Sequence, residues 1–265
     1  MSISIRTSLM LSAFAMAALT AAFASPPSGQ SENADAPAAP PRHWAYGGED
    51  GPEHWGEMSA DNRACSGGLQ QSPIDLTSAI GAKVDVPHPA WIPAKGGMVV
   101  NNGHTIQVDL SDAGGMTLDG KEYSLKQFHF HHPSEHTIDG KQVPLELHLV
   151  HAAQDGSLAV VGILFTEGAA NETLNDIWAT APAKEGKAAV AFQIDVSKFM
   201  PQGTEAFRYE GSLTTPPCSE TVHWTVMAKP QTASAAQIAA FTQLFPWNAR
   251  PVQPLNRRFV LKTSS

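Results

Sequence analysis

Two segments of alternating sequence, 126–131 and 145–151, constrain the fold more than any other feature of the chain. They read Lys-Gln-Phe-His-Phe-His and Leu-Glu-Leu-His-Leu-Val-His. Because side chains point to alternate faces along a β-strand, His129 and His131 share one face of the first segment. If the two segments are antiparallel neighbours in one sheet, His148 on the second segment converges with these two histidines.

Three imidazoles on one rigid face form a good Zn²⁺ site with an open fourth coordination position. Gln127 and Glu146 share these faces and are suitable acceptors for the second ring nitrogen of a ligand. The alternative is a chance grouping of ordinary strand histidines. The spacing favours the metal site, since two histidines two residues apart are matched by a third on a similarly patterned strand.

The segment His129-x-His131-x-x-x-Glu135 also matches the core of a cupin metal motif, which would imply a small β-barrel. The flanking residues argue against this alternative. Gly120 and Gly140 lie at distances from the motif that do not fit cupin spacing, and no second cupin motif follows.

The rest of the chain is typical of a mainly β (α+β) protein. Its 21 Gly and 20 Pro among 265 residues suit short strands and many turns better than a helical bundle. Asn171–Thr180 and Ser234–Leu244 have helical periodicity, and Thr232 or Ser234 is available as the N-cap of the second helix. Strand-like runs separated by turn residues occupy 98–100, 105–110, 126–131, 145–151, 158–166, 192–195, 207–213 and 221–227. We expect a large β-sheet with short peripheral helices.

The N-terminus has the pattern of an export signal. Arg6 precedes an uncharged run over 9–24 that ends in Ala-Phe-Ala, which fits an A-x-A cleavage site. A membrane anchor is the alternative, but this Ala-rich run is short for a span of about 20 residues. We therefore predict a signal peptide at 1–24, a Pro/Ala-rich disordered linker at 25–42 and one ordered domain at 43–265.

Cysteine count and charge narrow the class of protein further. Cys65 and Cys218 are the only cysteines, and an even count in an exported protein predicts a disulfide; two unpaired buried thiols are the alternative. A formal net charge of −8 without a cluster of Lys or Arg argues against a nucleic-acid binder. Hydrophobic residues make up 42 % of the chain, enough for a sizeable core, which excludes wholesale disorder.

Taken together, these residues resemble the α-class carbonic anhydrases, of the exported bacterial type. The matching stretches run in order through about residues 42–260, and their combination is highly specific. They include His43-Trp44-x-Tyr46, Asn102-Gly103-His104, Gln127-Phe128-His129-Phe130-His131, Ser134-Glu135-His136, Glu146-Leu147-His148-Leu149-Val150-His151, Leu213-Thr214-Thr215-Pro216-Pro217-Cys218 and Asn248-x-Arg250-Pro251.

The resemblance implies a single twisted, mostly antiparallel, ten-stranded sheet. It also implies a zinc lyase that hydrates CO₂ reversibly to bicarbonate and a proton. His129, His131 and His148 match the zinc ligands of this family, in which the metal lowers the pKa of bound water to about 7 and so provides the attacking hydroxide. The residues that match hydrogen-bond partners of the ligands are Gln127 for His129, Glu146 for His148 and the backbone carbonyl of Asn248 for His131.

Three further groups of residues match catalytic positions by the same resemblance. Thr214 corresponds to the gatekeeper whose hydroxyl donates to Glu135, and His104 corresponds to the proton shuttle at the cleft mouth. The substrate-binding wall corresponds to Val150, Val160, Leu213, Thr215, Val222 and Trp224. The positions that organise the water chain correspond to Tyr46, Asn102 and Gln107, where Gln107 replaces an Asn common in the family.

A non-catalytic carbonic-anhydrase-like binding module is the competing interpretation. Such a module is expected to lack a zinc histidine or to carry a membrane anchor, and the sequence shows neither feature. We therefore expect an exported enzyme, periplasmic or alternatively secreted, that is free of the membrane after signal cleavage. Its partner is a small-molecule substrate, CO₂ or bicarbonate, and we expect a monomer or a homodimer.

Overall fold

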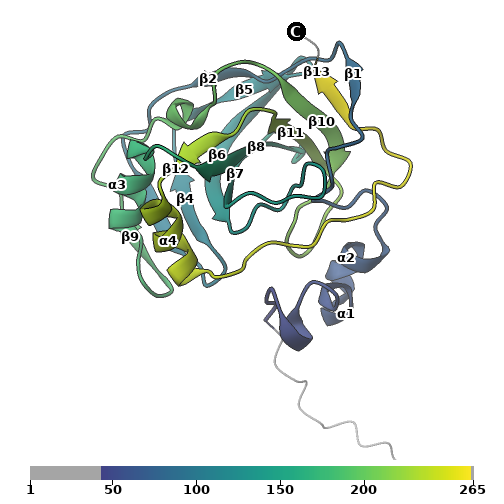
Figure 1. The fold of residues 1–265 in the computed structure, drawn as a ribbon, viewed down its shortest axis with the longest axis horizontal. Coiled ribbons are helices and arrows are strands. Elements are labelled where there is room, and N and C mark those ends of the chain that lie inside the picture. The colour runs from purple at the N-terminus through teal and green to yellow at the C-terminus, as the bar shows by residue number, and fades with distance from the viewer. Residues whose placement is uncertain (1–42, 264–265) are drawn as a thin grey trace, which may run out of the picture. The chain divides into compact units, whose positions relative to one another are not determined.

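The fold is a single sheet of thirteen strands with a few short helices (Figure 1). The computed structural model describes residues 43–263, so the predicted signal peptide and linker lie outside the described residues. The strands are β1 (Ile80–Ala82), β2 (His88–Trp91), β3 (Gly97–Asn101), β4 (Ile106–Leu110), β5 (Gly114–Leu118), β6 (Lys121–His131), β7 (Leu145–Ala152), β8 (Leu158–Glu167), β9 (Gly186–Ala189), β10 (Ala206–Gly211), β11 (Val222–Met227), β12 (Gln231–Ala233) and β13 (Leu261–Thr263).

Most of the strands follow one continuous path, in the order β1-β13-β10-β11-β8-β7-β6-β4-β3-β9. The other three strands attach beside this path: β12 pairs with β8, and β2 pairs with β5, which pairs with β6. The parallel pairs are β1 with β13, β8 with β11 and β8 with β12, and the remaining pairs are antiparallel. The predicted mainly β class and mostly antiparallel sheet are confirmed, with three short strands beside the ten-stranded path.

Both predicted helices form, and each begins with a side-chain cap. The helices are α1 (Trp55–Met58), α2 (Ala64–Gly67), α3 (Glu172–Thr180) and α4 (Ala235–Leu244), with 3₁₀ turns at Gly48–Asp50, Ala60–Asn62 and Val196–Phe199. The Asn171 side chain accepts hydrogen bonds from two backbone amides at the start of α3. Ser234, rather than Thr232, caps α4 in a reciprocal pair with Gln237. None of the described helices has the length and apolar character needed to cross a membrane.

The predicted strand at 192–195 is wrong. Of these residues only Ile194 makes a sheet-like bridge, an isolated one to Ala94. Asp195 then accepts a hydrogen bond from the Ser197 amide and starts the 3₁₀ turn Val196–Phe199. The apolar character that suggested a strand instead serves packing, because Ile194 is buried in the core.

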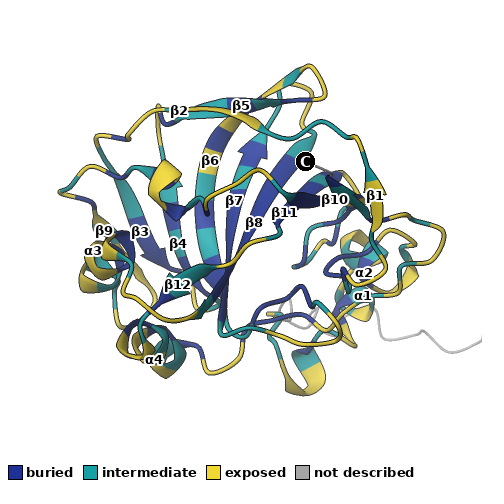
Figure 2. Ribbon diagram, turned by 45° about the horizontal axis from the view of Figure 1, so that its top comes forward, coloured by how far each residue is buried: buried dark blue, intermediate teal, exposed yellow. Residues whose placement is uncertain are grey.

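The long strand β6 contains a bulge, so the buried apolar positions are odd-numbered before it and even-numbered after it. Between Leu125 and Gln127 the register with β7 shifts by one residue. Tyr123 and Leu125 before the bulge therefore share the apolar core with Phe128 and Phe130 after it, and Figure 2 shows the central strands as largely buried. The histidine side of β6 consequently faces the opposite way from this core.

The core behind the histidines is closed by aromatic rings. Phe128 and Phe130 are fully buried, and their ring centroids lie 5.9 Å apart. Phe130 also contacts Trp178 of α3 and Phe241 of α4, at centroid distances of 4.8 and 6.1 Å. Burying each Phe stabilises the fold by about 1.5–3 kcal/mol. These contacts hold β6 against α3 and α4 and leave its histidine face free.

The predicted disulfide between Cys65 and Cys218 is confirmed. It joins α2 to the segment that follows β10, across a sequence separation of 153 residues. This segment contains Thr214, so the crosslink anchors one wall of the candidate site described below.

Loss of this disulfide should lower the melting temperature by about 8–20 °C, because a reopened loop of 153 residues regains chain entropy worth about 4–5 kcal/mol. Thermal unfolding with and without reductant measures the shift. The double variant Cys65→Ala with Cys218→Ala is the control, since reductant should not change its melting. Unchanged melting of the fully reduced protein would show that the crosslink adds nothing to stability.

Candidate active site

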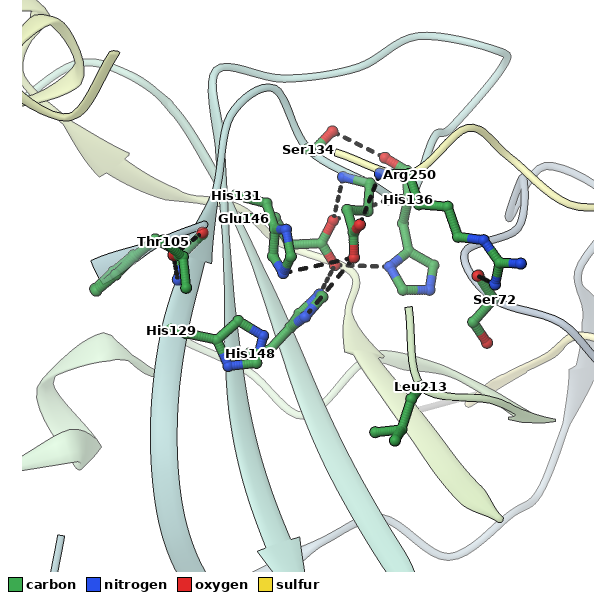
Figure 3. Close-up of polar contacts among 12 residues, drawn as sticks. Ser72, Thr105, His129, His131, Ser134, His136, Glu146, His148, Leu213 and Arg250 are labelled. Atoms are coloured by element: carbon green, nitrogen blue, oxygen red, sulfur yellow. Dashed lines mark hydrogen bonds and ion pairs between the residues drawn. The ribbon is translucent and has the colours of Figure 1, made fainter. Parts of the chain in front are cut away.

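Three histidines from β6 and β7 meet on one face of the sheet (Figure 3). His129 lies directly opposite His148 in the strand register, and His131 follows two residues along β6. Their ring centroids are 4.5–5.3 Å apart, and potential ligand atoms of all three lie within 4.8 Å of one another. The predicted convergence is confirmed, and the three side chains form a metal site.

Each histidine uses one ring nitrogen to hold its ring in place. The three contacts join His129 Nδ1 to Gln127 Oε1 (2.9 Å), His131 Nδ1 to the Asn248 carbonyl (2.8 Å) and His148 Nε2 to Glu146 Oε1 (2.9 Å). These acceptor oxygens leave the second nitrogen of each ring for the metal. The Nε2 atom of His131 is buried and has no hydrogen-bond partner among the described residues, which fits a metal ligand.

Burial keeps all three imidazoles neutral. It lowers the pKa of His131 to about 4, and it lowers the pKa values of His129 and His148 below their usual range as well. The lone pairs that bind a metal are therefore available at neutral pH.

Glu146 is the carboxylate that organises the site from behind. It is fully buried and accepts hydrogen bonds from His148, from His136 Nδ1 (2.6 Å) and from the backbone amides of Glu135 and His136 (both 2.9 Å). Burial alone would raise the pKa of this carboxyl, but the two histidines and their hydrogen bonds hold the pKa well below its usual value. Glu146 therefore stays charged while it orients a metal ligand.

The network continues beyond Glu146 through residues for which the sequence analysis predicts no role. His136 Nε2 lies 2.7 Å from the Tyr209 hydroxyl, which donates to Ser72 Oγ at 2.9 Å. Ser72 Oγ in turn accepts from the backbone amide of Ser212, just before the Thr214 segment. His136 and Ser72 lie in stretches that match the family, Ser72 within Gln71-Ser72-Pro73-Ile74-Asp75, and the sequence holds no separate signal for Tyr209.

Glu135 is a second fully buried carboxyl beside the metal site. Burial raises its pKa to about 7, although His148, the Arg250 amide and the Thr214 hydroxyl act in the opposite direction. Its Oε1 accepts a hydrogen bond from the backbone amide of Arg250 (2.8 Å), and its Oε2 lies 3.5 Å from His131 Nε2. Glu135 Oε2 has no hydrogen-bond partner among the described residues, so its partnership with Thr214 stays a prediction.

A cleft of about 150 Å³ opens above the histidines. Val150, Val160, Leu213 and Trp224 form an apolar part of its wall, beside Thr214 and Thr215. Val222 does not line this cleft. It is buried in the apolar cluster beneath, together with Val160 and Trp224, because it lies on β11 where the strand packs into the core.

The cleft mouth brings together Tyr46, Asn102, His104 and Gln107. The His104 ring stacks on Trp44 at a centroid distance of 3.6 Å and on His43 at 4.9 Å. Partial burial and the nearby His43 lower the pKa of His104, and Glu185 acts against this shift. His104 is therefore neutral at pH 7.

Comparison with known proteins decides the family. A family model described as eukaryotic-type carbonic anhydrase matches residues 50–264. The chain belongs to the α-class carbonic anhydrases. It is 48 % identical to a carbonic anhydrase of Nostoc over 83 % of this chain and 86 % of that protein. It is also 44 % identical to a carbonic anhydrase of Pectobacterium carotovorum, over 83 % of this chain and 90 % of that protein.

A solved structure agrees with these relatives. The α-carbonic anhydrase of Thermovibrio ammonificans, in complex with the inhibitor sulfanilamide, superposes with a TM-score of 0.80 at 43 % identity, covering 83 % of this chain and 98 % of that one. The chain therefore has carbonic anhydrase activity, a lyase activity, and acts on a small molecule, and the triad His129, His131 and His148 is its metal site.

The metal affinity of this carbonic anhydrase should depend on the Glu146 carboxylate, which holds the ligand His148. Glu146→Gln should weaken metal binding about 10- to 100-fold, because the amide offers no charged acceptor to His148 and His136. Competition with a chelator measures the affinity. Glu210→Gln is the matched control, since Glu210 contacts His223 at the surface (2.9 Å). Equal affinity in both variants would contradict the role of Glu146.

Proposed function

We propose that this carbonic anhydrase hydrates carbon dioxide reversibly to bicarbonate and a proton, with Zn²⁺ held by His129, His131 and His148. One observation carries the proposal. Three neutral imidazoles converge, and in each ring one nitrogen is held by an oxygen acceptor while the other is left for the metal. Three histidines with an open fourth position are a donor set suited to catalytic zinc. When bound, the zinc ion lowers the pKa of water to about 7, the value known for carbonic anhydrases, and so makes hydroxide available at neutral pH.

Glu135 and Thr214 set the direction of hydrogen bonding beside the metal site. A threonine hydroxyl has one donor and two acceptor lone pairs. If it donates to Glu135, only its lone pairs remain for a group in the cleft. Such an arrangement favours a nucleophile that carries a hydrogen and disfavours anions that lack one. The Arg250 amide holds the other Glu135 oxygen, so the carboxyl cannot swing away.

The apolar wall provides the place for CO₂. The molecule has no net dipole and gains nothing from displacing water at polar groups. Val150, Val160, Leu213 and Trp224 present apolar surface next to the histidine triad. We propose that they hold the substrate with its carbon facing the metal site and exclude water from this side of the cleft.

His104 removes the proton that hydration releases. Its ring lies at the cleft mouth, and its buried Nε2 atom has no hydrogen-bond partner among the described residues. A neutral imidazole with a pKa somewhat below its usual value suits transfer between the cleft and buffer. Tyr46, Asn102 and Gln107 line the path between His104 and the metal site and would order the intervening water.

We also propose that the enzyme works outside the cytoplasm. The Cys65–Cys218 disulfide suits an oxidising compartment, and the sequence pattern supports a signal peptide at 1–24, a linker at 25–42 and a catalytic domain at 43–265. Periplasmic export is the proposed destination, as a monomer or a homodimer.

The activity should require about one zinc ion per chain. Stopped-flow CO₂ hydration should disappear on treatment with a strong chelator and return when Zn²⁺ is restored. His148→Ala should lose most metal and activity, because two imidazoles bind zinc far more weakly than three. Metal analysis of the purified protein provides the count. Full zinc content in the His148→Ala variant would show that the ligand set is wrong.

Replacing the proposed proton shuttle should distinguish the hydration of CO₂ from the removal of the released proton. His104→Ala should lower kcat about 10- to 50-fold in weak buffer, while kcat/KM for CO₂ stays nearly unchanged, because kcat/KM reports steps up to bicarbonate release. Small imidazole buffers should restore much of the loss. His88→Ala, at a surface histidine paired with Asp85, is the control. Equal loss in both constants, without rescue by imidazole, would end the assignment.

A further inference from the structure

We propose that the side-chain amide of Asn248 is a positioning residue that sets the distance between His104 and the metal site. The sequence assigned a role only to its backbone carbonyl, which holds His131. The inference rests on the proposed function of His104 as the proton shuttle. It adds a separate role for the carboxamide, which contacts different groups from those that the carbonyl contacts.

Asn248 connects both functional elements from a buried position. It is 1 % exposed and follows α4 in the chain. Its Nδ2 donates to the carbonyls of His104 and Phe130, both at 2.9 Å, and its Oδ1 accepts from the His132 amide at 2.6 Å. One planar amide thus joins the backbone of the proposed shuttle to the backbone on both sides of the metal ligand His131.

The sheet itself does not make this connection. The pairing of β4 with β6 runs from Asp109 opposite Gln127 to Gln107 opposite His129. The β4–β6 pairing ends there, and His104 lies in the turn between β3 and β4, whose last pair joins Asn101 to Ile106. Within the turn, the Asn102 side chain accepts from the amides of His104 and Thr105, which shapes the turn without tying it to β6.

Among residues 43–263, the side chains of Thr105 and Asn248 join the turn to β6, and of these two Asn248 reaches His104. The Thr105 hydroxyl donates to the Phe130 carbonyl at 2.5 Å. Asn248 donates to that same carbonyl and also to the carbonyl of His104. The rate of proton transfer depends on the distance between the metal site and His104. A displacement of His104 by about 1 Å is therefore enough to slow this transfer.

The chemistry of this position requires a carboxamide. Asn supplies two N–H donors and one acceptor in a plane, and both ends are used here. Asp has the same shape but replaces the donor end with an oxygen that would face two carbonyl oxygens. Asn248→Asp should therefore push the His104 turn away while the backbone carbonyl of residue 248 continues to hold His131.

The test is the steady-state kinetics of Asn248→Asp in the zinc-loaded enzyme. We expect kcat in weak buffer to fall about 3- to 10-fold, kcat/KM for CO₂ to stay within about twofold, and imidazole buffer to restore kcat. Zinc content should remain about one per chain, because the His131 contact is a backbone contact. Asn248→Ser, which removes the N–H donors without adding a charge, replaces the Asp variant should that variant not fold.

Two comparisons distinguish positioning from a loss of stability. In a His104→Ala background, Asn248→Asp should produce no further loss of kcat, because its effect passes through His104. Gln237→Glu is the matched control: Gln237 is a buried amide that donates to the Asn171 carbonyl and to Asn175, far from the turn in sequence, so it should lower stability without changing the kinetic constants.

The inference would be overturned by any of three results. These are an unchanged kcat in Asn248→Asp, an equal fall of kcat and kcat/KM, and an additive loss in the His104→Ala background. Failure of the shuttle assignment itself gives a different pattern. His104→Ala alone would then either leave kcat unchanged or lower kcat and kcat/KM equally, whatever the Asn248 variants do.

Discussion

The pairing of β6 with β7 is the constraint on which the rest of the site depends. Because His129 stands opposite His148 in this ladder, three imidazoles meet without any loop having to place them. The opposite side of β6 carries Phe128 and Phe130, which are fully buried against aromatic residues of the core. A slip of one residue would exchange the two sides and place histidines in the core, so packing and metal binding enforce the same register.

The contacts around each of the two buried carboxyls beside the triad determine its charge. Glu146 keeps its charge because two histidines and two backbone amides surround it. Glu135 has fewer compensating contacts, so burial raises its pKa to about 7. The two carboxyls are close in sequence and equally buried, and their different surroundings hold the pKa of Glu146 low and raise that of Glu135, which lies beside the histidine triad.

The segment after α4 holds several functional parts at once. The Asn248 carbonyl fixes a metal ligand, and the Arg250 amide fixes Glu135. The buried Arg250 guanidinium donates to the Cys65 carbonyl, to Gln71 and to the Ser72 carbonyl, so this segment is tied to the region near the disulfide. The contacts to His131 and Glu135 come from the backbone of this segment, whereas the side chains of Asn248 and Arg250 make further contacts to the neighbouring turn and segments.

The sequence by itself determined the metal ligands, their two nearest side-chain acceptors and both longer helices, because each depends on local alternation or capping. It also determined the disulfide, because two cysteines allow only one pairing within the chain. It also determined the family, because many short motifs occur in one order. Only the tertiary structure decided which short segments join the sheet, since strands such as β1 and β13 are three residues long and carry no periodic signal. It moved Val222 from the cleft wall into the core, reduced 192–195 to a single bridge, and revealed His136, Tyr209 and the Asn248 amide as connecting groups. Their partners lie far away in sequence, so their contacts exist only once the sheet has formed.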